Sequence, residues 1–184
     1  MSAKINKRYY LWGGFSDTDS LNLNKLQAQV NNQFYGPKFN VHLTLSGPFY
    51  NLDNEIINGI ENVALTNNSI VMRTTGYGIA ENIFQSFYVG IENSIELSEL
   101  KTSLDIHLNI SSQGYNPHIS LFYGEKEITL KKELIKELSV PPVSIILDKI
   151  SIVAIFDQIE SWEILYSFPL IQNKDVKLSL GRPI

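Results

Sequence analysis

The chain of 184 residues contains no cysteine. Disulfide bonds, cysteine-ligated zinc, iron–sulfur clusters and thiol catalysis are therefore all excluded. Basic residues are not in excess either, because 15 Lys and Arg stand against 19 Asp and Glu and the net charge is −4. A protein that grips a long polyanion needs many cations to neutralise its phosphates. We therefore expect a small phosphorylated ligand as the partner, and no duplex DNA.

Long hydrophobic runs are also missing. The most apolar late stretch, residues 145–156, is interrupted by Asp148 and Lys149, whereas a membrane span needs about 20 predominantly apolar residues. Residues 1–8 are polar and lack the apolar run of a signal peptide. Asn is abundant and Ala is scarce, which hints at an AT-rich bacterial or phage genome. We expect no membrane association, a monomer, and a cytoplasmic location (the host cytoplasm if the gene is phage-encoded).

What is present indicates a folded domain of alternating strands and helices. Apolar residues make up 43% of the chain and charged residues 18%, which is enough for a sizeable core. Aromatic and β-branched stretches predict strands over residues 9–15, 39–45, 69–75, 83–91, 115–123, 143–156 and 162–168. Apolar residues at helical spacing predict helices around positions 23–34, 56–63, 97–108 and 130–138. Asp19 or Ser20 is the expected N-cap of the first helix, and Gly76 and Gly78 predict a turn between two strands.

One segment occurs twice. Residues 39–45 (FNVHLTL) align without gaps on residues 115–121 (YNPHISL). The Asn, the His and the final Leu are identical, and each copy lies between two predicted helices. We interpret the chain as one α+β domain over residues 1–184, built from two intertwined lobes about a pseudo-twofold axis. Two antiparallel sheets should line a central cleft, with helices packed outside.

The repeated segment places polar side chains on one face of each strand. Because side chains i and i+2 of a strand share a face, His42 lies beside Thr44 and His118 beside Ser120. One neutral imidazole can take a proton from an attacking water or ribose hydroxyl, and the other, as imidazolium, can protonate the leaving oxygen. The two hydroxyls can donate hydrogen bonds to phosphate oxygens. The sequence thus predicts two catalytic histidines and two phosphate contacts of a phosphodiesterase.

Other roles for these residues are less well supported. A single His-x-Thr on a strand is more often structural than catalytic, and the second matched copy is what favours function. His107, the third histidine, has no hydroxyl residue two positions later and is expected at the surface or in packing. No metal or cofactor is expected, since neither copy has His-Glu-x-x-His or an adjacent carboxylate. Covalent catalysis by Ser120 is disfavoured because the Gly-x-Ser-x-Gly elbow is absent.

The paired segments resemble the His-x-Thr/Ser motifs of the two-histidine (2H) phosphoesterase superfamily, and in particular the small cyclic phosphodiesterases of plants and yeast. Further family-like features follow in order over residues 9–170: Leu11-Trp12, Gly36-Pro37-x-Phe39, Phe84-Gln85, His118-x-Ser-x-x-Tyr123 and Trp162-Glu163. The resemblance implies a bilobal fold and metal-free opening of a cyclic phosphate on a nucleotide or ADP-ribose derivative. It implies His42 and His118 as the acid–base pair. The lack of cysteine departs from some relatives, so no redox control is expected.

The resemblance also implies aromatic side chains that stack on the substrate base. The candidates are Trp12, Phe49, Phe122 and Tyr123, with Gln85 as a further contact. Strict alternation puts Phe122 on the cleft face, whereas the resemblance favours Tyr123, and a bulge in the strand would reconcile the two. For each aromatic residue taken singly, core packing is the more common role.

Two other functions stay open at this point. A phage enzyme of the same superfamily could degrade the cyclic oligonucleotide signals of host defence. A non-catalytic module could instead bind and sequester a nucleotide, although binding alone would not need two proton carriers. The sequence also leaves open which histidine is the base and which the acid.

Overall fold

The computed structural model describes residues 7–111 and 114–172, and within them four α-helices alternate with seven β-strands. The strands are β1 (Arg8–Phe15), β2 (Leu43–Phe49), β3 (Ile70–Ile79), β4 (Phe87–Ile91), β5 (His118–Phe122), β6 (Ser144–Ile155) and β7 (Glu163–Pro169). The helices are α1 (Asp17–Phe34), α2 (Asn54–Thr66), α3 (Ile95–Leu108) and α4 (Ile128–Glu137). Two short 3-10 helices, η1 (Ile83–Gln85) and η2 (Ile159–Ser161), precede β4 and β7.

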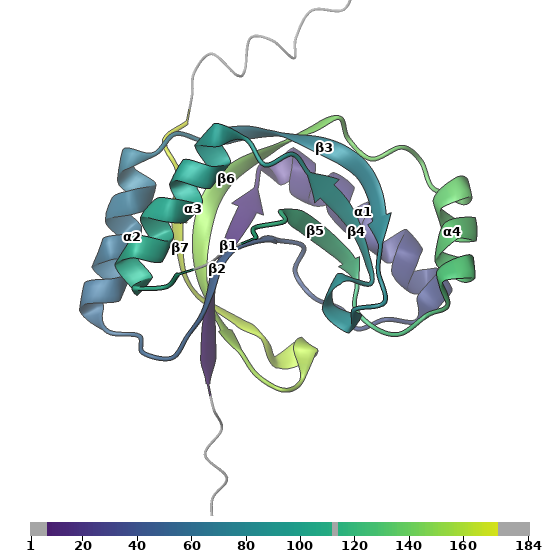
Figure 1. Cartoon of the computed structure of the whole chain (residues 1–184), viewed down its shortest axis with the longest axis horizontal. Coiled ribbons are helices and arrows are strands. Elements are labelled where there is room, and N and C mark those ends of the chain that lie inside the picture. The colour runs from purple at the N-terminus through teal and green to yellow at the C-terminus, as the bar shows by residue number, and fades with distance from the viewer. Residues whose placement is uncertain (1–6, 112–113, 173–184) are drawn as a thin grey trace, which may run out of the picture.

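The strands form one antiparallel sheet in the order β1-β2-β5-β4-β3-β6-β7, and β1 also pairs with β6 (Figure 1). The long strand β6 serves both halves: its first part pairs with β3 and its second part with β7, while β1 runs along the opposite edge. In the described residues β2 and β5 pair only at Leu43 and Ile119. The sheet therefore has two lobes, one with β1, β2, β6 and β7 and one with β3, β4 and β5. They are joined through β6 and meet again at β2 and β5.

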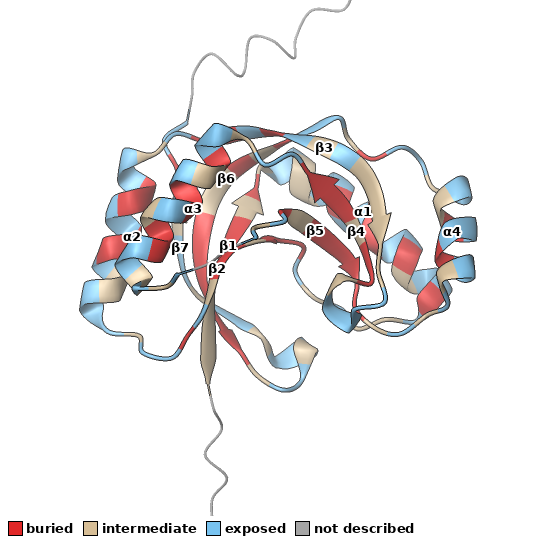
Figure 2. Ribbon diagram, in the orientation of Figure 1, coloured by how far each residue is buried: buried red, intermediate tan, exposed pale blue. Residues whose placement is uncertain are grey.

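The helices cover the outside of the lobes and are exchanged between the two copies of the repeat. Helix α1 follows β1 but packs mainly on β5, and α3 precedes β5 but packs on β2. Figure 1 shows α2 and α3 together on one side of the molecule and α4 on the other. Buried residues fill the sheet and the inner faces of the helices (Figure 2). The predicted α+β class, with antiparallel strands inside and helices outside, is confirmed; the two expected sheets are joined by hydrogen bonds into one.

Strand boundaries differ from the prediction by three residues or more in four strands. Residues 39–42 stay outside β2 and residues 115–117 stay outside β5, and in each stretch a backbone carbonyl accepts a hydrogen bond from the histidine ring. Strand β3 does not turn at the two glycines but continues to Ile79, and Gly76 takes a φ of 95° that favours glycine. Residues 83–85 form η1 instead of a strand.

Helix α1 begins earlier than predicted. Its N-cap is Ser16, not Asp19 or Ser20. The Oγ of Ser16 accepts a hydrogen bond from the backbone N–H of Asp19 (3.2 Å) and donates one to the Asp19 carboxylate (2.7 Å). The same carboxylate accepts from the backbone N–H of Ile146 in β6 (2.9 Å). The cap thus ties the start of α1 to the strand shared by both lobes.

Replacing this cap should have a measurable cost. We expect Ser16→Ala to lower the free energy of unfolding by about 1 kcal/mol, because one N-terminal N–H of α1 loses its acceptor. Ser103→Ala is the matched control, since the Ser103 hydroxyl only bonds the Glu99 carbonyl within α3 (3.0 Å) and such a change costs less than about 0.5 kcal/mol. Urea denaturation measures both variants. Equal losses would show that Ser16 does not cap the helix.

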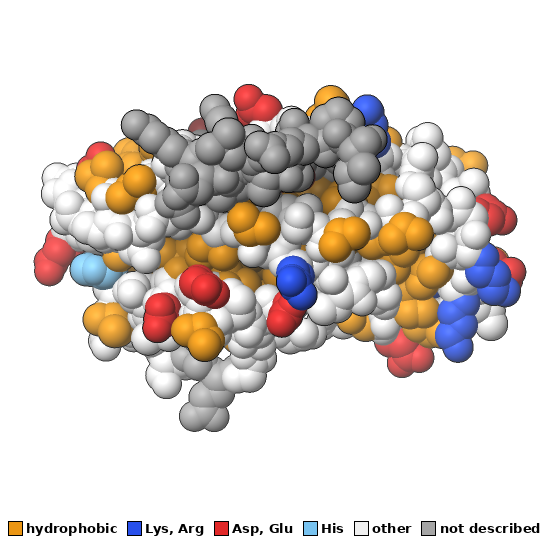
Figure 3. Space-filling view, turned by 90° about the horizontal axis from the view of Figure 1, so that it is seen from above, with side chains coloured by type: hydrophobic (Ala, Val, Ile, Leu, Met, Phe, Trp, Pro, Cys, Tyr) orange, Lys and Arg blue, Asp and Glu red, His pale blue; other side chains and the backbone are white. Residues whose placement is uncertain are grey.

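The face of the molecule seen in Figure 3 carries both acidic and basic side chains. Acidic and basic side chains stand next to one another at several places there. None of the helices in the described part of the chain is long and apolar enough to cross a bilayer.

Candidate active site

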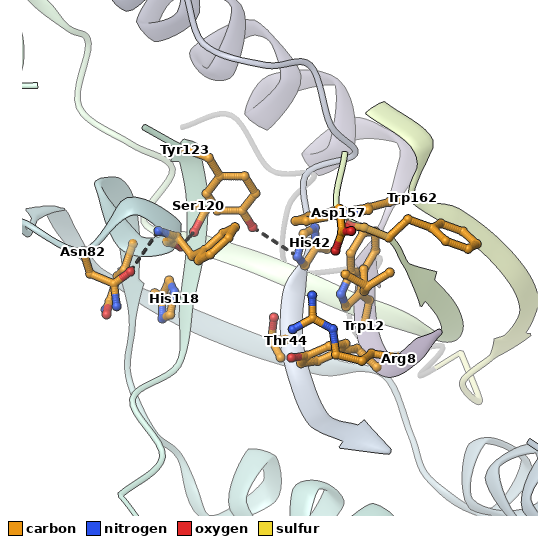
Figure 4. A pocket seen from close by; sticks show the side chains of 15 residues that line it. Arg8, Trp12, His42, Thr44, Asn82, His118, Ser120, Tyr123, Asp157 and Trp162 are labelled. Carbon is orange, nitrogen blue, oxygen red and sulfur yellow. Dashed lines mark hydrogen bonds between the residues drawn. The ribbon is translucent and has the colours of Figure 1, made fainter. Parts of the chain in front are cut away.

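A cleft of about 550 Å³ opens between the two lobes (Figure 4). Strands β1 and β2 and the loop between β6 and β7 supply one side, and η1 and β5 supply the other. Seven of the nine residues predicted from the sequence line it: Trp12, His42, Thr44, Gln85, His118, Ser120 and Tyr123. The structure therefore brings both copies of the repeat to one cavity, with His42 and Thr44 (the first motif) facing His118 and Ser120 (the second motif).

A backbone carbonyl two positions earlier orients each histidine. Nδ1 of His42 lies 2.6 Å from the carbonyl oxygen of Asn40, and Nδ1 of His118 lies 2.9 Å from that of Asn116. Because a carbonyl can only accept, Nδ1 donates in both rings. In each ring Nε2 is then the nitrogen left to accept a proton or, once protonated, to give one up. The Asn of the repeat thus contributes its backbone, not its amide.

The two histidines differ in burial. His42 is 6% exposed and stacks on the Trp12 indole, with ring centroids 3.5 Å apart and planes inclined by 7°. Desolvation lowers the pKa of His42 from 6.5 to about 4; the hydrogen bond to Asn40 opposes the shift in part and the charge of His118 adds to it. His118 is half-buried, with its ring edge-on to Tyr88 (5.2 Å). His42 is therefore neutral at neutral pH, whereas solvent reaches His118.

A tyrosine from the second lobe reaches the first histidine. The Tyr123 hydroxyl lies 3.5 Å from Nε2 of His42 (Figure 4). Burial raises the pKa of Tyr123 to about 12, with a hydrogen bond to Ser120 opposing the shift. The hydroxyl is therefore protonated and can donate to His42 or to a phosphate oxygen. The Ser120 Oγ itself donates to the Phe84 carbonyl (3.2 Å).

Strict alternation predicts Phe122 on the cleft face, but the structure places it outside the cleft lining, because β5 contains an irregularity. Phe87 pairs with Phe122, but the next residue of β4, Tyr88, pairs with Ser120, so β5 carries one extra residue there. This bulge turns Phe122 into the core, where it is 2% exposed and packs edge-on against Phe34 (5.2 Å). It turns Tyr123 toward the cleft.

Phe49 also lies outside the cleft, contrary to the prediction. It ends β2 at 6% exposure and packs against Tyr9, with ring centroids 5.5 Å apart. Trp12 lines the cleft, but one face of its indole is covered by His42 and its edge meets Trp162 (5.9 Å, 62°). Trp12 thus supports His42 and has little free surface for a base. Gln85 lines the cleft from η1.

The remaining cleft residues were not predicted: Arg8, Tyr10, Asn82, Phe84, Ile155, Phe156, Asp157 and Trp162. They come from the start of β1, from η1 and from the β6–β7 loop, and only the chain crossings bring them together. Arg8 is the one cation and Asp157 the one carboxylate in this lining. Two of them had a sequence signal: Phe84, through the family-like Phe84-Gln85 pair, and Trp162, through the Trp162-Glu163 pair. Trp162 donates its indole N–H to the Phe156 carbonyl (2.9 Å).

Side chains able to bind a metal ion are dispersed over residues 7–111 and 114–172. No three His, Cys, Asp or Glu side chains gather there in a group that could hold one.

The model of the 2′-5′ RNA ligase superfamily matches residues 16–155, a segment that includes both motifs. The chain belongs to this superfamily of two-histidine phosphoesterases. The apo crystal structure of Escherichia coli LigT superimposes with a TM-score of 0.63, over 92% of this chain and 100% of LigT, at 16% identity. The crystal structure of LigT with 3′-AMP superimposes with a TM-score of 0.61 at 15% identity, over 91% of this chain and 99% of LigT. The Thermus thermophilus protein TT0787 superimposes with a TM-score of 0.58 at 16% identity, over 90% of this chain and 99% of TT0787.

At these identities the likeness of this 2H phosphoesterase to the solved structures concerns the fold. A comparison with curated proteins found no match. The predicted superfamily is confirmed, and the finer resemblance to plant and yeast cyclic phosphodiesterases stays a prediction.

Proposed function

We propose that this 2H phosphoesterase hydrolyses the cyclic phosphate of a nucleotide, of the 2′,3′-cyclic or the ADP-ribose 1″,2″-cyclic type, without a metal ion. One observation carries the proposal. Nδ1 of His42 and Nδ1 of His118 each donate to a backbone carbonyl, so both rings have Nε2 available for proton transfer in the same cleft. Two proton carriers on opposite sides of one cavity suit in-line displacement at phosphorus.

The difference in burial assigns the roles. We infer that His42, neutral because it is desolvated, is the base, and that the more exposed His118 is the acid. Nε2 of His42 takes a proton from water as the water oxygen bonds to phosphorus. The bond from phosphorus to one ribose oxygen breaks, and that oxygen receives the proton from Nε2 of His118. The bound phosphodiester anion raises the pKa of His42 by its charge, which makes the base stronger once substrate is in place.

Different residues contact the phosphate and the nucleobase of the substrate. Thr44 donates to a non-bridging oxygen, and Ser120 does so once its single O–H turns from the Phe84 carbonyl to the phosphate. Both hydroxyls stabilise the charge that develops on these oxygens, and Arg8 attracts the anion into the cleft. Phe84 is 58% exposed and lies edge-on to Tyr123 (5.7 Å), so its open face suits stacking on a nucleobase beside Gln85. The fold is compatible with such a ligand, because LigT has been solved with 3′-AMP, NADP+ and ATP.

Phosphorus NMR on a panel of substrates in EDTA tests the proposal. The panel holds 2′,3′-cyclic mononucleotides, ADP-ribose 1″,2″-cyclic phosphate, and cyclic di- and trinucleotides. We expect conversion of one of the first two to a phosphomonoester. Turnover of the cyclic oligonucleotides alone would favour the anti-defence enzyme, and tight binding with every substrate intact would favour the sequestering module. Loss of activity in EDTA that returns with a divalent metal would refute the metal-free mechanism.

A further inference from the structure

We propose that the aromatic residue that opens each copy of the repeat positions a cleft residue from the other copy's side of the site: one holds Thr44 of the first motif, and the other holds Tyr123, which follows the second motif. These residues are Tyr115, which opens the second copy, and Phe39, which opens the first. Neither contacts the reacting atoms, and each acts through another residue. The effect of this positioning on activity rests on the function proposed above.

Tyr115 links the two motifs directly. Its hydroxyl donates to the backbone carbonyl of Thr44 (3.1 Å), crossing from the segment before β5 to strand β2. Its neighbour Asn116 supplies the carbonyl that orients His118 (2.9 Å). Burial raises the pKa of Tyr115, and the charge of Asp105 adds to the shift, so the hydroxyl is protonated and donates. Tyr115 is therefore hydrogen-bonded to the first motif, and it directly precedes Asn116, whose carbonyl orients His118 of the second motif.

This link matters because the two motifs have few other connections. Strands β2 and β5 pair at Leu43 and Ile119 alone among the described residues. The distance between Nε2 of His42 and Nε2 of His118 therefore depends on what holds β2 against the segment before β5. A displacement of about 1 Å in an active site can cost about 10²-fold in rate.

Residues of helix α3 contact the Tyr115 ring and strand β2. The Lys101 ammonium lies 5.1 Å from the centroid of the Tyr115 ring and forms an ion pair with Asp105 (2.7 Å). Asp105 also accepts a hydrogen bond from the Ser46 hydroxyl. An irregularity in the β1–β2 pairing next to Ser46 turns this side chain to the α3 side, although it lies two residues after Thr44. Strand β2 is thus fixed from the same side at Thr44 and at Ser46.

Phe39, in the first copy, contacts Tyr123, which lines the cleft after the second motif. Its ring stacks on the Tyr123 ring, with centroids 4.0 Å apart and planes inclined by 20°. The hydroxyl of that tyrosine lies 3.5 Å from Nε2 of His42. Phe39 also meets the His42 ring edge-on (6.2 Å, 73°). The first copy therefore fixes the direction of Tyr123, which follows the second motif.

Tyr115→Phe, compared with Tyr77→Phe, tests the link at the first motif. Both changes remove a hydroxyl that donates to a backbone carbonyl, but the partner of Tyr77 is Ser139 (2.7 Å), outside the cleft. For Tyr115→Phe we expect kcat to fall about tenfold with KM within about twofold, because the substrate contacts stay while their alignment is lost. Tyr77→Phe should match the wild type in both constants. Equal kcat values in the two variants would overturn the proposal.

Nitrogen-15 NMR of the imidazoles separates this proposal from the proposed function. We expect the ring resonances of His42 or His118 to shift in Tyr115→Phe and not in Tyr77→Phe. If the wild type turns over no substrate, the proposed function fails and these spectra still decide the positioning. Unchanged resonances in Tyr115→Phe would overturn the positioning even if the wild type is active.

Phe39→Leu gives an independent test at Tyr123. Its control is Phe168→Leu, which disrupts another stacked pair, with Tyr166 on β7 (6.3 Å, 6°), away from the cleft. We expect Phe39→Leu, but not the control, to lower kcat severalfold and to shift the Nε2 resonance of His42. An Nε2 resonance equal to that of the wild type would overturn the reciprocal role of Phe39.

Discussion

Replacing His42 or His118 by alanine is expected to lower kcat by about 10²–10⁴, since each variant loses one of the two proton transfers. His118 is half-buried at the start of β5, so its removal should leave the fold intact. His42 lies stacked against Trp12, and alanine there would leave a gap. His42→Gln is therefore a second variant at this site, because its amide can still donate to the Asn40 carbonyl. Steady-state kinetics with the substrate found by phosphorus NMR measure all three.

His107→Ala is the matched control for these variants. This third histidine is exposed near the end of α3 and lines no part of the cleft. Its removal should leave kcat and KM unchanged. Full activity in the alanine variant of either cleft histidine would refute the acid–base pair.

The two motifs could be predicted because their geometry is local. Side chains two positions apart in extended backbone share a face, which predicts Thr44 beside His42 and Ser120 beside His118. Both pairs line the cleft, although His42 lies one residue before the start of β2. The repeat then indicates that the two pairs are equivalent, and the alternating apolar pattern of the chain predicts the α+β class. The family match confirms the predicted superfamily, and the structure confirms the α+β class.

The alternation of side chains between the two faces of a strand could not predict the positions at which a strand departs from it. One extra residue in β5 turns Phe122 into the core and Tyr123 into the cleft. A similar irregularity beside β1 turns Ser46 to α3. Both arise from pairing with strands distant in the sequence, so no local signal marks them. Arg8 and Asp157 were missed for the same reason, because only the pairing of β1 with β6 places them in one cleft.

Acidification should destabilise the protein through His42. The pKa of this buried imidazole is about 4 in the folded state, against 6.5 as its ordinary value. Between these two pH values the unfolded chain binds more protons than the folded one, so the free energy of unfolding rises with pH across this window. Stability from this source is complete above about pH 6.5, falls as the pH drops, and levels off below about pH 4. The full difference is roughly 3 kcal/mol.

Urea denaturation of the wild type and His42→Gln between pH 7 and pH 4 isolates this contribution. Other groups titrate in the same range; burial raises the pKa of Asp148, for example, which acts in the opposite direction. These contributions are common to both proteins and cancel in the difference. We expect the stability of the wild type relative to the variant to fall by roughly 3 kcal/mol over this range. The same dependence of stability on pH in the wild type and in His42→Gln would contradict the desolvation of His42. It would also remove the reason for assigning this histidine as the base. The burial that lowers stability in acid is what keeps Nε2 of His42 unprotonated at neutral pH.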